Sequence, residues 1–270
     1  MRGYRHPSLV PPSRRVTERI QRTAELRAAG YDKNAVRRMV RAGILTRLCR
    51  GAYTDGAPDD LHARHRLLIR AALGELAPAA VASHVSAAVL HGLPTWALRL
   101  DRAHVTFARR SGGRRDDRLY VHTAPVRPDE IVVIDDKRLT TAARAVVDIA
   151  RTAEFAPAVA VADAALRLDA RPYRELDRVE RPALPGAVTR AELDAALRRA
   201  TGWRGVPDAR RAVGLADGRA ESVGESRSRV AIALAGLPPP ELQWPAVRRI
   251  DGVLRDFTDT AARIRDRFRG

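Results

Sequence analysis

The stretch DKNAVRRMVRAGILTRLCRGAY, residues 32–53, has the pattern of a short basic helix, a turn at Gly43 and a compact β-hairpin. Asp32 suits the N-cap of the helix, Gly43 suits its C-terminal stop, and Gly51 suits the hairpin turn. At about 100° per residue, the apolar side chains of the helix share one arc and the basic side chains share the opposite arc. The apolar arc consists of Val36, Met39 and Val40. This order of elements is typical of a winged helix-turn-helix that reads DNA.

The polar arc of this helix and the arginines of the hairpin are the candidate DNA-binding side chains. Guanidinium groups on one helix face can contact phosphates and guanine edges, and arginines of a hairpin beside the groove can contact the backbone. The candidate residues are Lys33, Asn34, Arg37, Arg38, Arg41, Arg47 and Arg50. The alternative is an ordinary amphipathic helix and hairpin with a solvated basic face. Binding to duplex DNA distinguishes these two interpretations.

The positive charge of the chain is concentrated in its N-terminal part. The whole sequence of 270 residues has a formal net charge of +17. Residues 1–56 alone hold 13 Arg or Lys against four Asp or Glu, a net charge of +9. Lys33 and Lys137 are the only lysines, so part of the excess reflects a general bias toward arginine and alanine. The uneven distribution nevertheless favours a polyanionic partner such as nucleic acid.

The cysteine content and the N-terminal residues predict the compartment. Cys49 is the only cysteine, which excludes an internal disulfide and a cysteine-based zinc cluster. The first residues, MRGYRHPSLVPPSRR, are basic but contain no continuous apolar segment. No later stretch has the run of about 18 apolar residues that a membrane span needs. We therefore expect a cytoplasmic protein without a membrane partner.

Turn-rich segments such as TDGAPDD at 54–60 divide the chain into several parts, as in a multidomain α+β protein. We expect a flexible basic arm at 1–13, a winged-helix domain at 14–56, a small central α+β domain at 61–155, a helical linker region at 156–217 and a C-terminal segment at 218–270. Hydrophobic periodicity predicts helices at 15–29, 61–76, 79–90, 142–151, 157–169, 189–201 and 222–235, and strands at 104–107, 119–122 and 131–134.

Four segments of the sequence, taken in order, resemble one known family. They are AGILTRLCRGAYT at 42–54, ASHVSAAVLHGLP at 82–94, RLTTAARAVVDIAR at 138–151 and GESRSRVAIALAGLPPPELQWP at 224–245. The set resembles the actinobacterial AbiEi-like proteins, described as type IV toxin–antitoxin antitoxins or transcriptional regulators. Such proteins often have a C-terminal domain similar to the very-short-patch-repair endonucleases.

This resemblance implies an N-terminal winged helix that binds operator DNA and a central antitoxin-like domain. The central domain would take part in repression or in countering a nucleotidyltransferase toxin. We therefore expect a regulator that represses its own operon, with double-stranded DNA and such a toxin as partners. We expect no cofactor and no enzymatic activity.

A metal-dependent DNA endonuclease is the alternative function. The resemblance places Glu225 at the first acidic position of the nuclease-like domain, and Asp256 with Phe257 at its Asp-Phe pair. Such nucleases hold a divalent cation between several carboxylates, commonly with a lysine nearby. The residues after Phe257, TDTAARIRDRFRG, lack the expected acidic strand, and no lysine follows Lys137. We therefore predict an incomplete nuclease-like segment at 218–270, with Glu225 as an exposed helix acid and Asp256 as a turn acid.

The histidines and one acidic loop remain to be interpreted. His84 and His91 are seven residues apart on a predicted helix and lie about 20° apart around its axis, which predicts a hydrogen-bonded structural pair. We place His62 and His65 on the surface. Spacing supplies no further ligands, so no metal site is predicted. The segment SGGRRDD at 111–117 is interpreted as a β-hairpin turn. A third possible function is an interaction module that does not bind DNA and whose basic charge is compositional.

Overall fold

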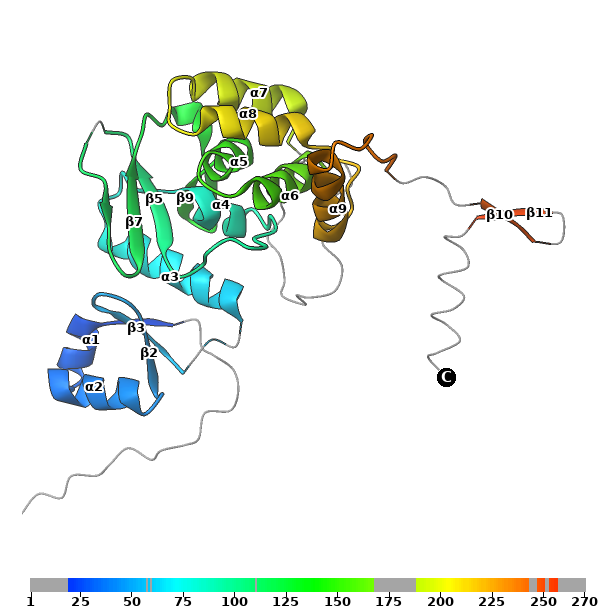
Figure 1. Cartoon of the computed structure of the whole chain (residues 1–270). Helices are drawn as coiled ribbons and strands as arrows, with labels where there is room; N and C mark the ends of the chain where they lie inside the picture. Colours follow the sequence, from blue (N-terminus) through cyan, green and yellow to red (C-terminus); the bar gives the residue numbers. More distant parts are fainter. Residues whose placement is uncertain are drawn as a thin grey trace, which may run out of the picture.

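The computed structural model describes residues 19–167, except 57, 59 and 110, residues 188–242, and the backbone of two strands at 247–250 and 253–256. Its helices and strands are, in chain order, β1 (Ile20–Arg22), α1 (Thr23–Ala28), α2 (Lys33–Arg41), β2 (Leu45–Cys49), β3 (Ala52–Asp55), α3 (Leu61–Glu75), β4 (Val81–Ala82), α4 (His84–Leu90), β5 (Ala103–Phe107), β6 (Arg114–Arg115), β7 (Leu119–Thr123), the 3₁₀ turn η1 (Pro128–Glu130), β8 (Ile131–Ile134), β9 (Lys137–Thr140), α5 (Ala142–Ala150), α6 (Phe155–Leu166), α7 (Arg190–Arg199), α8 (Val206–Leu215), α9 (Val223–Leu234), β10 (Val247–Ile250) and β11 (Val253–Asp256). The protein is a mixed α and β structure, as expected (Figure 1).

The N-terminal unit consists of β1, α1, α2, β2 and β3, with the three strands in the order β1-β3-β2. The backbone N–H of Ala35 donates to the Asp32 carboxylate at 2.6 Å, so Asp32 caps α2 as predicted. Gly43 follows α2 with φ of 71°, a left-handed conformation that favours glycine and turns the chain into β2. The predicted helix and hairpin are therefore both present in the structure.

The helix expected at 15–29 is only partly correct. Residues 20–22 form the strand β1 instead, and the helix runs from Thr23 to Ala28. Ile20 pairs with Thr54 and Arg22 pairs with Ala52, so a distant strand supplies the backbone hydrogen bonds that local periodicity assigned to a helix. The expected helical residues 15–18 lie outside the described residues.

The N-terminal sheet lies between two helical layers (Figure 1). On one face, Leu45 of β2 and Tyr53 of β3 pack with Leu26 of α1 and with the apolar arc of α2. On the other face, Leu48 and Ala52 join the core that contains the buried leucines of α3. Because neighbouring strand residues point to opposite faces, this hairpin joins the N-terminal unit to the rest of the protein.

The central part is built on a six-stranded mixed sheet in the order β6-β7-β5-β4-β9-β8. Strand β5 runs parallel to β7 and β4 runs parallel to β9, whereas the remaining neighbours are antiparallel. Helix α3 packs against β4 and β5, and α4 follows β4 directly and packs against β5 and α5. The strands predicted near 104–107, 119–122 and 131–134 are present as β5, β7 and β8. The short strands β4, β6 and β9 of this sheet were not predicted from the sequence.

Helix α5 is the centre of a helical layer beside this sheet (Figure 1). It contacts α4, α6, α7 and α8, and α9 packs on α6. The shared core contains Val146 and Val147 of α5, Val159 of α6 and Leu193 of α7. We expected a linker over residues 156–217, but its described residues pack into the same core as α5. Helix α8 was not predicted. The division into domains stays a prediction.

The C-terminal part of the described chain is the antiparallel hairpin of β10 and β11, in which Val247 pairs with Asp256. The predicted nuclease-like features fall largely outside the described residues. The structure does not describe the side chain of Asp256, and it does not describe Phe257 or the residues that follow. Among the described residues, no helix combines the length and the apolar character needed to cross a membrane.

Candidate functional site

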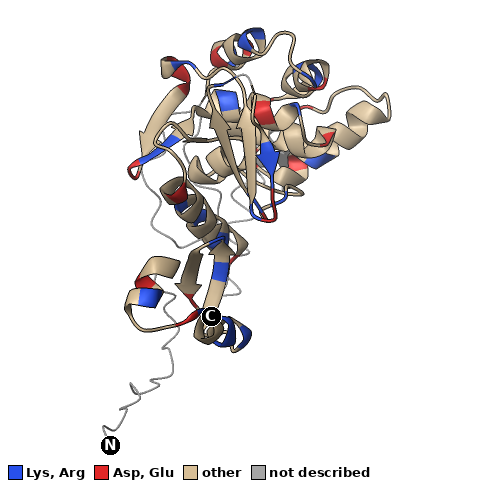
Figure 2. Ribbon diagram, turned by 90° about the vertical axis from the view of Figure 1, so that its left-hand side faces the viewer, with Lys and Arg blue, Asp and Glu red and all other residues tan. Residues whose placement is uncertain are grey.

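Helix α2 presents one apolar face and one basic face, as the sequence predicts. Val36 is buried, and Met39 and Val40 are half-buried against the N-terminal core. The side chains on the other face are all exposed: Lys33, Asn34, Arg37, Arg38 and Arg41. The α2 segment contains four basic residues and no acid. The basic residues of α2 are blue in Figure 2.

The polar side chains of α2 have no hydrogen bond or ion pair to any other residue in the part of the chain that the structure describes. Among the described residues, no acidic side chain neutralises the four cations of this face, and a phosphate ligand can take the place of their counterions. On the adjoining hairpin, Arg47 and Arg50 are exposed as well. The Arg47 Nε donates to the carbonyl of Cys49 at 3.4 Å, and Arg50 lies at the turn. The structure thus places all seven predicted side chains on one small unit.

A second group of polar residues lies inside the central part, where three histidines meet. His84 begins α4, His104 is on β5 and His122 is on β7. The Nδ1 of His104 lies 3.1 Å from the Nε2 of His122. The rings of His84 and His122 stack, with centroids 3.7 Å apart, and Tyr120 stacks on the other side of His122 at 4.0 Å.

Strand pairing explains why His104 and His122 meet. Because β5 and β7 are parallel, His104 pairs with Tyr120 and Thr106 pairs with His122. Alternation along each strand then places these four side chains on the same face of the sheet. Thr106 Oγ1 donates to Ser83 Oγ at 2.7 Å, and that oxygen lies 3.0 Å from the Nδ1 of His84.

Burial keeps the cluster uncharged. Desolvation, followed by the field of a neighbouring histidine, lowers the pKa of His104 and of His122 to about 3. Desolvation also lowers the pKa of the buried His84 well below 6.5, with His104, Arg151 and Arg144 adding to the effect. At neutral pH each of the three imidazoles therefore has one ring nitrogen without a proton.

Next to the histidines lies a buried ion network built on α5. Arg144 donates to Asp148 at 3.0 Å through Nε and to Glu130 at 3.2 Å through Nη1. Arg151 donates to Asp148 at 3.2 Å. The Arg144 and Arg151 guanidinium groups both lie over the ring of Trp203, 4.6 and 4.9 Å from its centroid. Asp148 links this network to the cluster, with Oδ2 3.9 Å from the His84 Nδ1.

The structure corrects two expectations about histidines. His84 and His91 are not a hydrogen-bonded pair, because His84 lies beside Ser83 and the Nε2 of His91 lies 2.7 Å from the Thr140 carbonyl. The helical spacing fails because α4 ends at Leu90 and His84 itself has φ of +50°. His65 is fully buried between the Leu100 carbonyl and Ser86, not on the surface.

Other predicted features are placed as follows. The interpretation of 111–117 as a hairpin turn is only partly correct: β5 and β7 are parallel, and the hairpin is instead formed by β6, which lies inside this segment, and β7. Asp116 accepts the N–H groups of Arg118 and Leu119 at 2.9 and 2.8 Å, which is a turn role. Glu225 accepts the N–H of Glu221 at 2.9 Å at the start of α9. The side chain of Asp256 lies outside the described residues, so a metal site shared by Glu225 and Asp256 stays untested.

Sequence patterns did not predict that His84, His104 and His122 form a cluster, nor the ion network beside it. The sequence did contain one signal for the cluster. His104 and His122 are polar residues that alternate with apolar residues in two β-like runs, AHVTF and LYVHT, so each histidine is expected on one face of its strand. A second signal was the i, i+4 pair Arg144 and Asp148 within the apolar helix AARAVVDIA. Neither signal says which strands become neighbours, so the cluster required the fold.

The chain is similar to one protein family and to several proteins of Mycobacterium tuberculosis. Residues 22–54 match the family described as transcriptional regulator, AbiEi antitoxin. This bears out the resemblance for the segment that contains α1, α2, β2 and most of β3, but not for a C-terminal endonuclease-like domain.

Over 109 residues, 40% of this chain, the sequence is 38% identical to the uncharacterized proteins MT2308 and Rv2248 of Mycobacterium tuberculosis strains CDC 1551 and H37Rv. The aligned part spans about a third, 34%, of the length of these curated relatives. The crystal structure of the RV2827C protein from Mycobacterium tuberculosis is similar with a TM-score of 0.42 and 14% identity, covering 86% of this chain and 84% of that chain.

Proposed function

We propose that this protein is a transcriptional regulator that binds double-stranded DNA through α2 and the β2–β3 hairpin. The observation that carries the proposal is the exposed polar face of α2, whose cations have no partner among the described residues. The match of residues 22–54 to a family of transcriptional regulators supports the same function.

The docking follows from the shape of the unit. In the proposed complex α2 lies in the major groove, where Asn34 and Arg38 reach base edges and Arg37 and Arg41 reach phosphates. Arg47 and Arg50 approach the backbone beside the groove and position the helix without reading the sequence. Because the hairpin also packs on α3, we expect the central part to move as one body with α2 and the hairpin and not to be joined to them by a free linker.

A triple substitution tests whether α2 binds DNA. The variant Arg37→Ala, Arg38→Ala, Arg41→Ala should keep its fold, because these side chains lie opposite the buried arc of α2. Affinity for duplex DNA should fall, and the slope of log K against log salt should decrease by about 0.9 for each phosphate that the variant no longer neutralises. Fluorescence anisotropy at several salt concentrations measures both quantities.

A matched control removes the same charge elsewhere. Arg198, Arg204 and Arg210 are exposed on or between α7 and α8, at the opposite end of the molecule from α2 (Figure 1). Their replacement by alanine should leave the salt slope close to that of the parent. If both triple variants bind DNA with the same affinity, binding depends only on the total charge of the protein, and α2 is not the DNA-binding helix.

The family description also supports a second candidate function. We propose that the protein represses its own operon and neutralises a nucleotidyltransferase toxin, because the matched family is described as an antitoxin family. Co-expression with a nucleotidyltransferase encoded beside the gene tests this function. Restored growth should persist in the α2 triple variant if neutralisation is separate from DNA binding. A toxin that stays fully active in the presence of the parent protein would rule the function out.

The same DNA preparations test the endonuclease alternative. We expect no cleavage with Mg²⁺ or Mn²⁺, since Glu225 takes part in capping α9. Cleavage that disappears in Glu225→Gln, while the helical signal is retained, would make the endonuclease the leading function.

A further inference from the structure

Three imidazoles that are far apart in the sequence converge on one point of the central part. His84, His104 and His122 each offer a ring nitrogen, and these nitrogens all lie within 4.8 Å of one another. The closest pair, His104 Nδ1 and His122 Nε2, is 3.1 Å apart. Two imidazole nitrogens bound to one tetrahedral zinc ion at about 2.05 Å are about 3.3 Å apart. The spacing of this pair is therefore already close to that of two ligands on a shared ion.

The backbone of His84 is strained in a way that serves this convergence. His84 has φ of +50°, although it is buried and is not a glycine. Such conformations cost about 1–3 kcal/mol and concentrate at functional sites. The strain lies at the first residue of α4 and brings the His84 ring onto His122, which belongs to a different element.

We propose that His84, His104 and His122 form a binding site for one divalent transition-metal ion, with Zn²⁺ as the representative ion. Neutral imidazole is the ligand that zinc, copper and nickel share, whereas magnesium and calcium require oxygen ligands. A shift of tautomer frees the two nitrogens that now face each other.

The neighbouring charges suit a cation at this point. Arg144 and Arg151 are balanced by Asp148 and Glu130, so the buried network has no net formal charge to repel the ion. The His84 Nδ1 lies 3.0 Å from the Ser83 Oγ, and the Asp148 Oδ2 lies 3.9 Å away, beyond hydrogen-bond distance. The ring rotation that binding requires can bring this carboxylate within reach of the His84 N–H, and a carboxylate behind a ligating histidine is a common arrangement around bound zinc.

The cluster also has a route to solvent. His104 and His122 are partly exposed, and His122 lines an open hollow of about 390 Å³ together with Tyr120 and the backbone around Gly113 and Arg114. Three protein ligands leave the fourth position of a tetrahedral ion open. We expect this fourth position to take water or a small anionic ligand that enters from the hollow beside His122.

One rearrangement is required for binding. The His84 and His122 rings are nearly parallel, with 14° between their planes, so one ion cannot lie in both ring planes. Rotation of one ring about its side-chain torsions brings the lone pairs together and breaks the stack. Metal binding should therefore be accompanied by a change in the environment of Tyr120, which stacks on His122.

The experiment uses untagged full-length protein, stripped with a chelator and then titrated with Zn²⁺ by isothermal calorimetry. We expect one equivalent to bind and to raise the melting temperature, because an ion that binds only the folded state stabilises it. His104→Gln and His122→Gln should each weaken binding at least tenfold. His65→Gln, which replaces a buried histidine outside the cluster, is the matched control and should bind as the parent does.

Substitution with Co²⁺ on the unaltered chain keeps the test independent of how the variants fold. Cobalt bound to three imidazoles and one water gives strong visible absorption bands, whereas hydrated cobalt absorbs weakly. The ring NMR signals of Tyr120, which stacks on His122, should shift when Zn²⁺ is added to the parent protein. The proposal is overturned if the parent protein binds no zinc when the Zn²⁺ concentration reaches about 100 times the protein concentration. It is equally overturned if His104→Gln and His122→Gln, shown to be folded by circular dichroism, bind as tightly as the parent.

Discussion

The arginines of α2 and the arginines of α5 show two opposite uses of the same residue. Arg37, Arg38 and Arg41 are exposed and have no partner among the described residues. Arg144 is 2% exposed and contacts Glu130, Asp148, the Pro125 carbonyl and the Trp203 ring. The first group is available to an external polyanion, and the second holds together elements of the fold.

This difference has an energetic consequence. A buried guanidinium must be paired, because an uncompensated charge inside a protein costs several kcal/mol. An exposed guanidinium costs almost nothing to the fold and can be changed while the structure is retained. The total of 49 lysines and arginines therefore overstates the number of cations available for binding DNA, since buried arginines such as Arg144 are paired with internal acids.

The largest effect should come from removing Arg144. The substitution Arg144→Ala leaves Glu130 and Asp148 buried without their main partner and should lower the free energy of unfolding by about 3–5 kcal/mol. Urea unfolding followed by circular dichroism measures the change. Arg38→Ala is the matched exposed control, expected within about 0.5 kcal/mol of the parent. A small effect of Arg144→Ala would remove the distinction between the two groups of arginines.

A second effect concerns the buried His65. Desolvation lowers the pKa of His65 to about 4, whereas an unfolded histidine titrates near 6.5. The unfolded state therefore binds a proton first as the pH falls, and stability decreases between pH 6.5 and 4 by up to about 3 kcal/mol from this residue.

Urea unfolding at several pH values tests this sign. In His65→Gln, the slope of the unfolding free energy against pH should fall by the equivalent of about one proton. In His62→Gln, which changes a partly exposed residue of α3, this slope should equal that of the parent. Stability that rises as the pH falls from 6.5 to 5 would contradict the buried, neutral state of His65.

A smaller effect is expected from the hairpin. The double variant Arg47→Ala, Arg50→Ala should weaken binding to all duplex sequences by similar factors and lower the salt slope by up to about two. Anisotropy with several unrelated duplexes measures this. If affinity for only one sequence changes, these arginines read bases and do not only position the helix.

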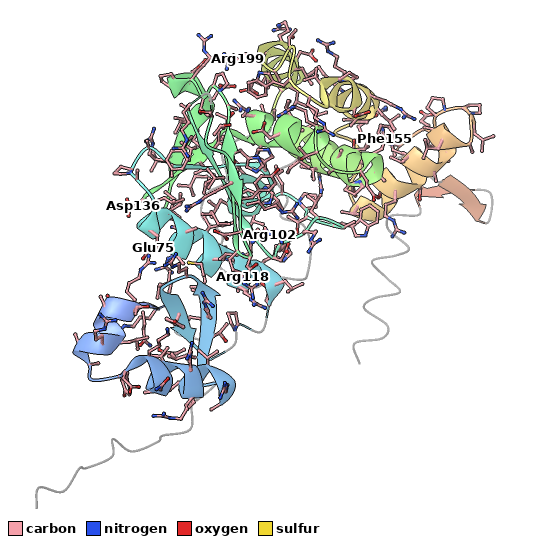
Figure 3. All side chains as sticks on the ribbon, turned by 60° about the vertical axis from the view of Figure 1, so that its left-hand side comes forward. Glu75, Arg102, Arg118, Asp136, Phe155 and Arg199 are labelled. Carbon is pink, nitrogen blue, oxygen red and sulfur yellow. The ribbon has the colours of Figure 1, made fainter. Side chains whose placement is uncertain are left out.

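The smallest effect is expected at the junction between the two regions. Arg22 contacts Glu75 at 2.6 Å, and Glu75 lies at the end of α3 facing the N-terminal unit (Figure 3). Glu75 is half exposed, so a double-mutant cycle of Arg22→Gln and Glu75→Gln should give a coupling of about 0.2–1 kcal/mol. Packing of Leu48 and Ala52 on α3 should hold the junction in every variant. A coupling above about 2 kcal/mol would show that the ion pair, not the packing, joins the regions.

Local patterns were sufficient for the amphipathic helices and for the candidate DNA-binding residues. The separation of α2 into an apolar face and a basic face depends only on helical periodicity and on the caps Asp32 and Gly43. All of these residues lie close together in the sequence. Strand β1 was predicted as helix because its partner β3 lies about thirty residues later. The role of the α2 side chains in binding DNA stays a prediction.

The sequence by itself determined the basic face of α2, the hairpin beside it and the mixed α and β character of the chain. Periodicity, caps and turn residues act over one or two turns, and they can be read without knowing the fold. Only the tertiary structure decided that His84, His104 and His122 meet and that Arg144 is buried. Which strands become neighbours depends on burial of the whole core, and that is a property of contacts between residues distant in the chain.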